Sequence, residues 1–419
     1  MPTLAPSRPR VHPALGTFIL LIALNLLNYI DRYILPGAQS LIQKEYSWDD
    51  QQMGALTTGF FFTYMLVAPL TGWLGDRLPR KPLIIAGAVL WSLATLGTAW
   101  VNSYWTLYLR HAIVGVGEAT FSIFAPAVLA DFYDERNRNR ILSIFYVAIP
   151  LGAALGYLAG GALGTRYGWR APFFLCAFPG LVVAALYWIF GREPQRGASD
   201  RVESNYNRAT FAGLFTNGAF LTATLGLAAL TFAMGGISTW VPTFLHRSLG
   251  YPVDKASFIV AAITAFDGIV ATALGGWLAQ RWLRTNDRAL YLFSALSVAL
   301  TLPFGALTFF GPRSTAVPAL FLAEFFLFLN TGPLNTAIVN SVAAPVRATA
   351  ISVNLLCIHL FGDTFSPQII GAVSDRTRNL SLALGLTLVS LAVSAVILQA
   401  GSRFAPRLNG DQSASPVVP

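Results

Sequence analysis

Residues 14–38 have the sequence ALGTFILLIALNLLNYIDRYILPGA. The stretch is almost free of charge, and about 20 such residues cross the hydrocarbon core of a bilayer as a helix. Its apolar residues do not alternate with polar ones, as they would in a membrane β-strand. It carries Asp31 beside Arg32, and ionisable side chains inside a membrane span are costly and usually functional. The stretch therefore predicts a membrane helix that contains a functional site.

The composition of the whole chain supports this interpretation. Of its 419 residues, 55% are hydrophobic and 11% are charged, whereas about 25% of the residues of a soluble domain are charged. Since lipid cannot satisfy backbone hydrogen bonds, apolar spans without alternation must be helices. The sequence predicts an all-α integral membrane protein that crosses the bilayer many times.

Several kinds of function are excluded by what the sequence lacks. The net charge of +9 comes from basic residues scattered over short loops, so we expect no nucleic-acid partner. The two cysteines, Cys176 and Cys357, lie in apolar segments and provide neither a disulfide framework nor a metal cluster. The phosphate-binding loop of ATPases and the motifs of zinc proteases and serine hydrolases are absent. We expect no metal, no cofactor and no enzymatic activity.

Twelve apolar stretches are long enough to cross the membrane. The predicted spans are 16–38, 52–75, 82–101, 105–131, 138–163, 172–190, 218–242, 255–281, 289–310, 316–340, 347–373 and 380–401. The longest polar stretch follows the sixth span and predicts a linker between two halves. The predicted organisation is a six-helix bundle over 1–190, a cytoplasmic linker over 191–213, a second six-helix bundle over 214–405 and a cytoplasmic tail over 406–419.

A short repeat indicates that the two halves are related. Residues 72–77 read GWLGDR at the end of the second span, and residues 275–281 read GGWLAQR at the end of the eighth, without the acid. Parallel repeats of this kind place a binding site between the halves, near the middle of the membrane. The predicted fold is therefore twelve transmembrane helices in two pseudo-symmetric six-helix bundles.

The distribution of basic residues predicts the orientation. If both termini and the linker lie in the cytoplasm, eighteen of the 28 Lys and Arg residues fall in cytoplasmic segments and eight on the other side. Cytoplasmic loops of membrane proteins carry such an excess. We therefore expect cytoplasmic termini, and the length and style of the chain favour a bacterial inner membrane.

Residues 72–81, GWLGDRLPRK, resemble the loop between helices 2 and 3 of the major facilitator superfamily. Residues 28–37, 110–131, 143–152 and 347–367 are similar to the Spinster family of that superfamily, although Thr120-Phe121 and Thr364-Phe365 depart from its usual pattern. The resemblance implies the twelve-helix fold, transport by alternating access and a cytoplasmic gate. The predicted gate residues are Gly72, Gly75, Asp76, Arg77, Arg80, Lys81 and Asp131. The alternative is a basic loop that happens to contain an acid.

Two intramembrane acids of the first half, Asp31 and Glu118, are the candidates for proton coupling. Burial and a nearby like charge favour the protonated form of a carboxyl group, whereas a neighbouring guanidinium favours the ionised form. If these opposed effects change as the cavity alternates between the two sides, the acids bind and release protons. The alternative is a static ion-pair network. The predicted conformational-switch or substrate-binding residues are Arg32, Arg110, His111 and Asp363.

Polar and aromatic residues within the spans are candidates to line the cavity. His111 lies seven residues before Glu118, on nearly the same helix face. Asp363 lies in a segment broken by Gly362 and Pro367, where its alternative role is to bond to a kinked backbone. The cavity-lining candidates are Tyr29, Phe60, Phe121, Tyr146, Asn335 and His359. For each aromatic residue the alternative is packing inside the bundle.

These observations predict a proton-coupled secondary active transporter, and the family resemblance implies an amphipathic substrate such as a lysophospholipid or a related lipid. The alternative on the same fold is a proton-coupled carrier of small organic anions or drugs, which Arg32 and Arg110 would bind directly. A membrane receptor is disfavoured because the linker and tails offer no signalling domain. The expected partners are a small-molecule or lipid substrate, protons and membrane lipid, and we expect a monomer.

Overall fold

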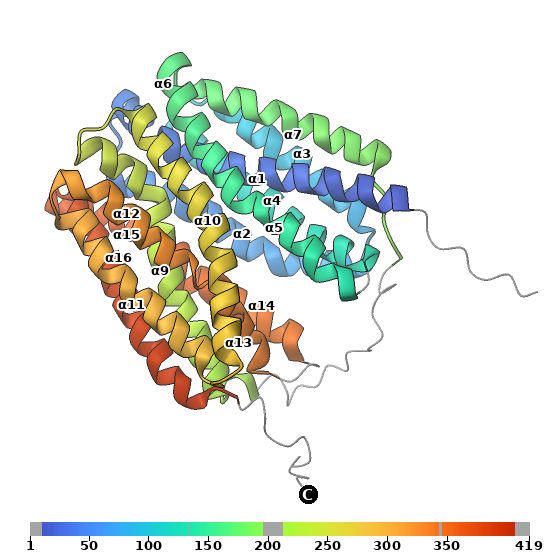
Figure 1. Cartoon of the computed structure of the whole chain (residues 1–419). Coiled ribbons are helices and arrows are strands. Elements are labelled where there is room, and N and C mark those ends of the chain that lie inside the picture. The colour runs from blue at the N-terminus through green and yellow to red at the C-terminus, as the bar shows by residue number, and fades with distance from the viewer. Residues whose placement is uncertain (1–10, 134, 196–212, 343–345, 407–419) are drawn as a thin grey trace, which may run out of the picture. The chain divides into compact units, whose positions relative to one another are not determined.

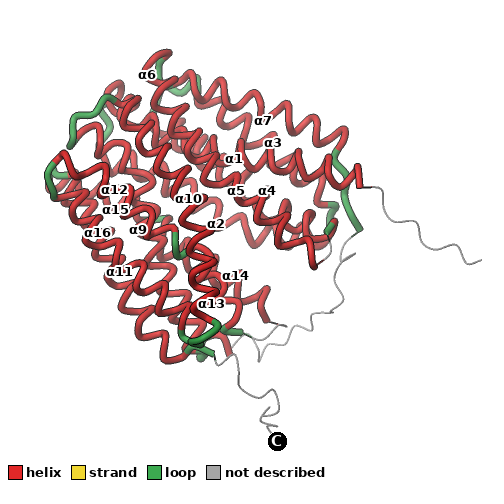
Figure 2. Tube along the Cα trace, viewed as in Figure 1, coloured by secondary structure: helices red, strands yellow, loops and turns green. Residues whose placement is uncertain are grey.

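The computed structural model describes residues 11–133, 135–195, 213–342 and 346–406. Within these ranges the chain forms helices joined by short loops, and no strand occurs (Figures 1 and 2). Eleven of these helical stretches are long and apolar enough to cross a membrane. A twelfth predicted span, 347–373, is present but interrupted. The predicted fold class, an all-α membrane protein, is confirmed.

The helices of the first half correspond to the first six predicted spans. Their bounds are α1 Val11–Tyr46, α2 Asp50–Arg77, α3 Arg80–Thr98, α4 Tyr104–Phe132, α5 Glu135–Leu158, the π-helical η1 Ala159–Leu163, α6 Gly164–Tyr167 and α7 Arg170–Phe190. Together, α5, η1 and α6 form the fifth span. Polar residues start two of them: Asp49 caps α2, and Ser103 caps α4. Each cap satisfies backbone N–H groups that have no partner inside the helix.

The helices of the second half repeat this arrangement. Their bounds are α9 Gly218–Arg247, α10 Val253–Leu283, α11 Ala289–Phe310, α12 Arg313–Phe328, α13 Thr331–Asn340, α14 Arg347–Ile358, the π-helical η3 His359–Asp363, α15 Ser366–Thr377, α16 Leu380–Gly401 and the short η4 Ser402–Phe404. The linker residues 196–212 and the tail residues 407–419 lie outside the described ranges.

Two predicted spans are interrupted rather than continuous. The predicted span 316–340 divides into α12 and α13 at Leu329 and Asn330, just before Pro333, which has no N–H to continue the helix. The predicted span 347–373 divides at η3, where Gly362 leaves helical geometry with φ −106° and ψ −107°. The break at Gly362 that the sequence predicted is confirmed. The fifth span also contains a π-helical segment, η1, but this lies near the end of the span, after the 24 residues of α5, whereas η3 follows the 12 residues of α14.

The chain packs as two compact units. One comprises Met1–Val202 with Val241–Ala265, and the other comprises Glu203–Trp240 with Phe266–Pro419. The ends of α9 and α10 that meet at their connecting loop therefore belong to the first unit. Each unit has its own apolar core.

In the first unit, glycines bring α5 against α1. A Cβ atom at Gly152, Gly156 or Gly160 would lie within 2.7 Å of a backbone oxygen of α1. Because these residues are spaced by four, they lie along one face of α5 and of η1, which continues it, and they allow the two backbones to touch. This contact fixes the rotation of α1, the helix that carries the Asp31-Arg32 pair.

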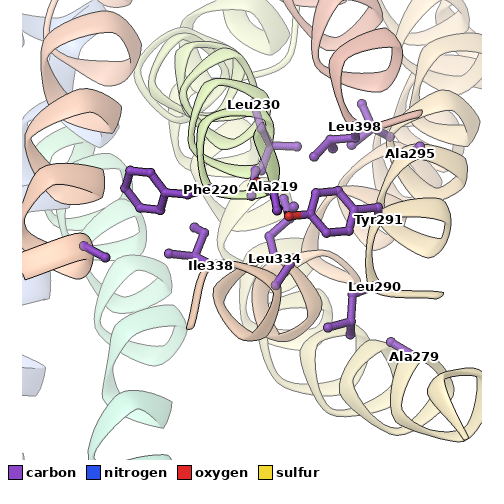
Figure 3. Close-up of a cluster of buried hydrophobic side chains, with 14 of the residues drawn as sticks. Ala219, Phe220, Leu230, Ala279, Leu290, Tyr291, Ala295, Leu334, Ile338 and Leu398 are labelled. Atoms are coloured by element: carbon purple, nitrogen blue, oxygen red, sulfur yellow. Dashed lines mark hydrogen bonds between the residues drawn. The ribbon is translucent and has the colours of Figure 1, made fainter. Parts of the chain in front are cut away.

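The core of the second unit gathers where α9, α11 and α16 meet (Figure 3). Tyr291 is 1% exposed and donates a hydrogen bond of 2.7 Å from its hydroxyl to the carbonyl of Ala219. A buried tyrosine hydroxyl needs such a partner. The bond ties the first turn of α11 to the first turn of α9.

Candidate functional site

The centre of the candidate site is an ion pair between α1 and α4. Arg32 donates two hydrogen bonds to Oε2 of Glu118, from Nε at 2.9 Å and from a terminal nitrogen at 2.7 Å. The Glu118 side chain is fully buried, and that of Arg32 is 14% exposed. The second carboxylate oxygen of Glu118, Oε1, has no hydrogen-bond partner among the described residues. One oxygen of the carboxylate is thus bound by Arg32, and the other has no partner among the described residues.

Aromatic rings surround the Arg32 guanidinium. Its central carbon lies 4.6 Å from the ring centre of Tyr29 and 5.0 Å from that of Phe60, and within 6 Å of Phe61 and Tyr64. Rings at such distances attract a cation through their negative faces. The arginine therefore has a second source of stabilisation besides Glu118.

Asp31 does not join this pair, although it precedes Arg32 in the sequence. It is 3% exposed, and neither carboxylate oxygen has a hydrogen-bond partner within the described ranges. Trp91 and Thr95 of α3 lie beside it but outside hydrogen-bonding geometry. The adjacent residues Asp31 and Arg32 therefore face different helices, and Asp31 has no direct contact with the ion pair.

The other candidates of the first half are divided between the site and its surroundings. His111 is buried, with its ring 5.3 Å from that of Phe60, and so lies beside the aromatic rings around Arg32. Arg110 lies apart from them, with its guanidinium packed over Gly97 near the end of α3. Phe121 is fully buried in the core against Trp91, whereas the side chain of Tyr146 is 46% exposed.

The second half brings together two of the predicted residues. His359 and Asp363 stand four residues apart within η3, and Nδ1 of His359 lies 2.9 Å from Oδ1 of Asp363. A Cβ atom at Gly362 would lie 3.0 Å from the carbonyl oxygen of Ala228, so this segment packs closely on α9. Asn335 is exposed and bonds locally to the carbonyl of Thr331 on its own helix.

The predicted gate residues at the α2–α3 end of the first unit have different surroundings. Arg80 pairs with Asp131 of α4 at 2.7 Å, while Arg77 lies over the ring of Trp73 at 4.1 Å. A Cβ atom at Gly75 would lie 2.1 Å from the ring of Phe124, whereas one at Gly72 would meet nothing within 4 Å. The side chain of Asp76 lies outside the described part of the structure.

Two polar contacts of the first unit were missed from the sequence. Glu193, just after α7, accepts hydrogen bonds from the backbone N–H groups of Arg80 and Lys81, and so caps α3, which has no side-chain cap of its own. At the opposite end, Arg247 binds both carboxylate oxygens of Asp50, at 2.6 and 2.8 Å. The uncapped start of α3 was a signal for the first contact. No local pattern signals the second, which joins residues 197 positions apart.

Comparison with known proteins gives consistent results. A family model described as Major Facilitator Superfamily matches residues 21–367. The human protein spinster homolog 1 is 35% identical over 379 residues, which cover 85% of this chain and 72% of the human protein. The zebrafish sphingosine-1-phosphate transporter is 32% identical over 376 residues, which cover 84% of this chain and 75% of that protein.

A solved structure has a similar fold. It is the crystal structure of a bacterial homolog of the human lysosomal transporter Spinster, in an inward-facing and unoccupied conformation. It matches with a TM-score of 0.84 at 23% identity and covers 94% of this chain and 98% of that one.

Proposed function

Because this chain belongs to the major facilitator superfamily and, within it, to the Spinster family, it is a transporter rather than an enzyme, and we propose that it couples the movement of an amphipathic substrate to that of protons. The observation that carries the proposal is the Arg32–Glu118 pair with its surrounding aromatic rings. Coupling requires that protonation of one group changes how another binds substrate.

The pair provides this link. When Glu118 is ionised, its carboxylate binds the guanidinium of Arg32. Protonation removes the negative charge and frees the guanidinium for an anionic group of the substrate. Loss of one partner from a buried ion pair costs about 3–5 kcal/mol, so protonation of Glu118 leaves Arg32 with a strong tendency to bind another anion. The rings contact the guanidinium while it is paired with Glu118 and help to hold it in place for the new partner.

Asp31 supplies a second site for a proton. No counter-charge lies against its carboxyl group among the described residues, and an isolated buried carboxylate is far more costly than a protonated one. The neutral form therefore suits the surroundings of Asp31 in this conformation. Release of its proton requires that α1 and α3 change their contact or that water enters. Each proton that moves down the membrane potential supplies about 2.3 kcal/mol per 100 mV.

The site favours a substrate with an anionic head and an apolar body. Arg32 suits a phosphate or carboxylate, and Phe60, Phe61 and Tyr64 offer apolar surface next to it. A lysophospholipid or a related lipid combines the two. The zebrafish relative is by name a transporter of sphingosine-1-phosphate. That molecule also combines an anionic head with an apolar body.

Proton flux in liposomes tests the proposal. The reconstituted protein is challenged with a panel of lysophospholipids, sphingoid phosphates and small organic anions while a trapped dye reports internal pH. We expect substrate-dependent proton flux with lysolipids. Glu118→Gln should abolish the flux but retain lysolipid binding at every pH, because the neutral amide leaves Arg32 free. Asp254→Asn, an exposed acid at the start of α10, is the control.

Two results would contradict the proposal. Flux with small organic anions alone would assign the protein to the alternative substrate class. Lysolipid transport that moves no protons and runs at the same rate in the wild type and in Glu118→Gln would contradict proton coupling.

We propose in addition that both termini face the cytoplasm, in a bacterial inner membrane. The excess of basic residues on that side supports this orientation. The test is a fusion, after residue 419, to a reporter enzyme that is active only in the cytoplasm. We expect this fusion to be active. An inactive reporter would indicate the opposite orientation.

A further inference from the structure

A groove runs between α11 and α16 in the second unit, and none of its lining residues belongs to the candidate site. Its volume is about 660 Å³, within the range of about 300–1,000 Å³ that small-molecule sites occupy. The two helices lie side by side and run in opposite directions, so the start of α11 and the end of α16 meet at one end of the groove (Figure 1). Figure 3 shows the opposite, inward side of these helices, where Tyr291 and Leu398 pack into the core.

The groove is apolar along its length and basic at one end. Small and aliphatic side chains form its walls, and Leu296 and Val396 are 53% and 68% exposed. At the end where α11 begins, the groove is lined by Arg288, Arg403, Ser402 and Gln399. Such exposed aliphatic surface is expected against lipid, because both helices are membrane spans.

The two arginines are available to a ligand. Neither guanidinium forms an ion pair within the described ranges of the chain. The nearest acid in the sequence, Asp287, lines a separate small pocket with Leu283 and Tyr291. The start of α11 has no side-chain cap, so the positive end of its dipole adds to the same charge.

The length of the groove matches one leaflet. Ala299 lies eleven residues beyond Arg288 on α11, about 16 Å at 1.5 Å per residue. The hydrocarbon core is about 30 Å thick, so half of it is about 15 Å. A ligand bound here has its charged group at the level of the helix ends and its apolar part beside the helices.

We propose that this groove is a binding site for an anionic phospholipid of the surrounding bilayer, held by Arg288 and Arg403 at its phosphate and by the walls of α11 and α16 along one acyl chain. Basic pockets between transmembrane helices on the cytoplasmic side bind such headgroups in general. The basic end of the groove is the end that the charge distribution assigns to the cytoplasm. The site is separate from Arg32 and Glu118 and holds resident lipid rather than transported substrate.

Native mass spectrometry of the delipidated protein tests the proposal. Phosphatidylglycerol and phosphatidylcholine with identical acyl chains are titrated separately, and bound copies are counted. We expect tighter binding of phosphatidylglycerol. Arg288→Gln or Arg403→Gln should weaken it about fivefold each, and the double variant on the order of thirtyfold. Arg284→Gln, an exposed arginine of the same connection that does not line the groove, should leave binding unchanged.

A second variant tests the apolar part. Ala299→Trp fills the groove while both arginines remain, and it should also weaken phosphatidylglycerol binding. Unchanged binding in the double arginine variant, or equal binding of phosphatidylcholine by the wild type, would overturn the proposal. Competition by free glycerol phosphate would reassign the arginines to a soluble anion. None of these measurements depends on transport, so they stand or fall independently of the proposed function.

Discussion

At the residue scale, the main result is the separation of Asp31 from Arg32. Successive residues of a helix point about 100° apart, so both cannot face Glu118. Arg32 takes that position and Asp31 faces α3. The two acids therefore have different surroundings: one has a counter-charge and the other has none. If both acids carry protons, as proposed, their unequal surroundings predict that they release them under different conditions.

Asp31→Asn tests the role of the unpaired acid. Asparagine has nearly the same shape and no charge, so it should fit beside Trp91 and Thr95 and leave membrane insertion intact. We expect it to abolish uptake driven by a pH gradient, because one proton site is lost. Exchange of labelled for unlabelled substrate, which needs no net proton movement, should continue. Gradient-driven uptake at the wild-type rate would remove Asp31 from the mechanism.

At the element scale, close helix contacts depend on particular glycines. In the last turns of α2, Gly72 and Gly75 were both predicted to belong to the gate, but they differ in the structure. Gly75 faces the buried ring of Phe124 on α4, and Gly72 faces open space in the structure. Of these two glycines, Gly75 is therefore the one that allows α2 to approach α4 in this conformation.

Gly75→Val and Gly72→Val form a matched pair. The valine at 75 would collide with Phe124, which is 3% exposed and packed in the core, so it has little room to move. We expect a loss of about 1–3 kcal/mol, the usual cost of overpacking, seen as a lower midpoint of thermal unfolding in detergent. Gly72→Val should leave the midpoint unchanged. Equal midpoints for the two variants would contradict the assigned contact.

At the scale of the whole molecule, alternating access requires that contacts at one end break as those at the other form. Within the first unit, Arg247 at the end of α9 binds Asp50 of α2 through two nitrogens and Gln43 of α1 at 2.9 Å. Bidentate arginine–carboxylate pairs are among the stronger polar contacts. This contact holds the segment Val241–Ala265 to α1 and α2.

Arg247→Gln should release that segment. The expected readout is faster labelling by a water-soluble maleimide of a cysteine at Ser40, whose hydroxyl now lies 3.4 Å from that of Thr243. The labelling uses a protein in which Cys176 and Cys357 are both replaced, so that the introduced cysteine is the only one.

High salt should have a similar but smaller effect when Arg247 is retained, because the Arg247 side chain is 42% exposed and is screened by ions. Arg166→Gln, an exposed arginine of α6, is the control. Labelling that does not change in Arg247→Gln would show that the contact does not hold the segment.

The sequence by itself determined the class of protein and where its helices lie. Spans such as 289–310 and 380–401 agree with α11 and α16 to the residue, because a helix in lipid must satisfy its own backbone and must be long enough to cross. The same reasoning identified Glu118, Arg32 and Asp131 as candidates, since charge inside a membrane span or beside the gate motif is visible in the sequence.

Only the tertiary structure decided which of these side chains meet. Arg32, rather than Arg110, pairs with Glu118 because Gly152, Gly156 and Gly160 set the rotation of α1 against α5. The contacts of Arg247 with Asp50 and of Glu193 with α3 depend on how helices far apart in the sequence pack. Hydrophobic length is a local property of the chain, whereas the rotation of a helix about its axis is set by the surfaces of its neighbours.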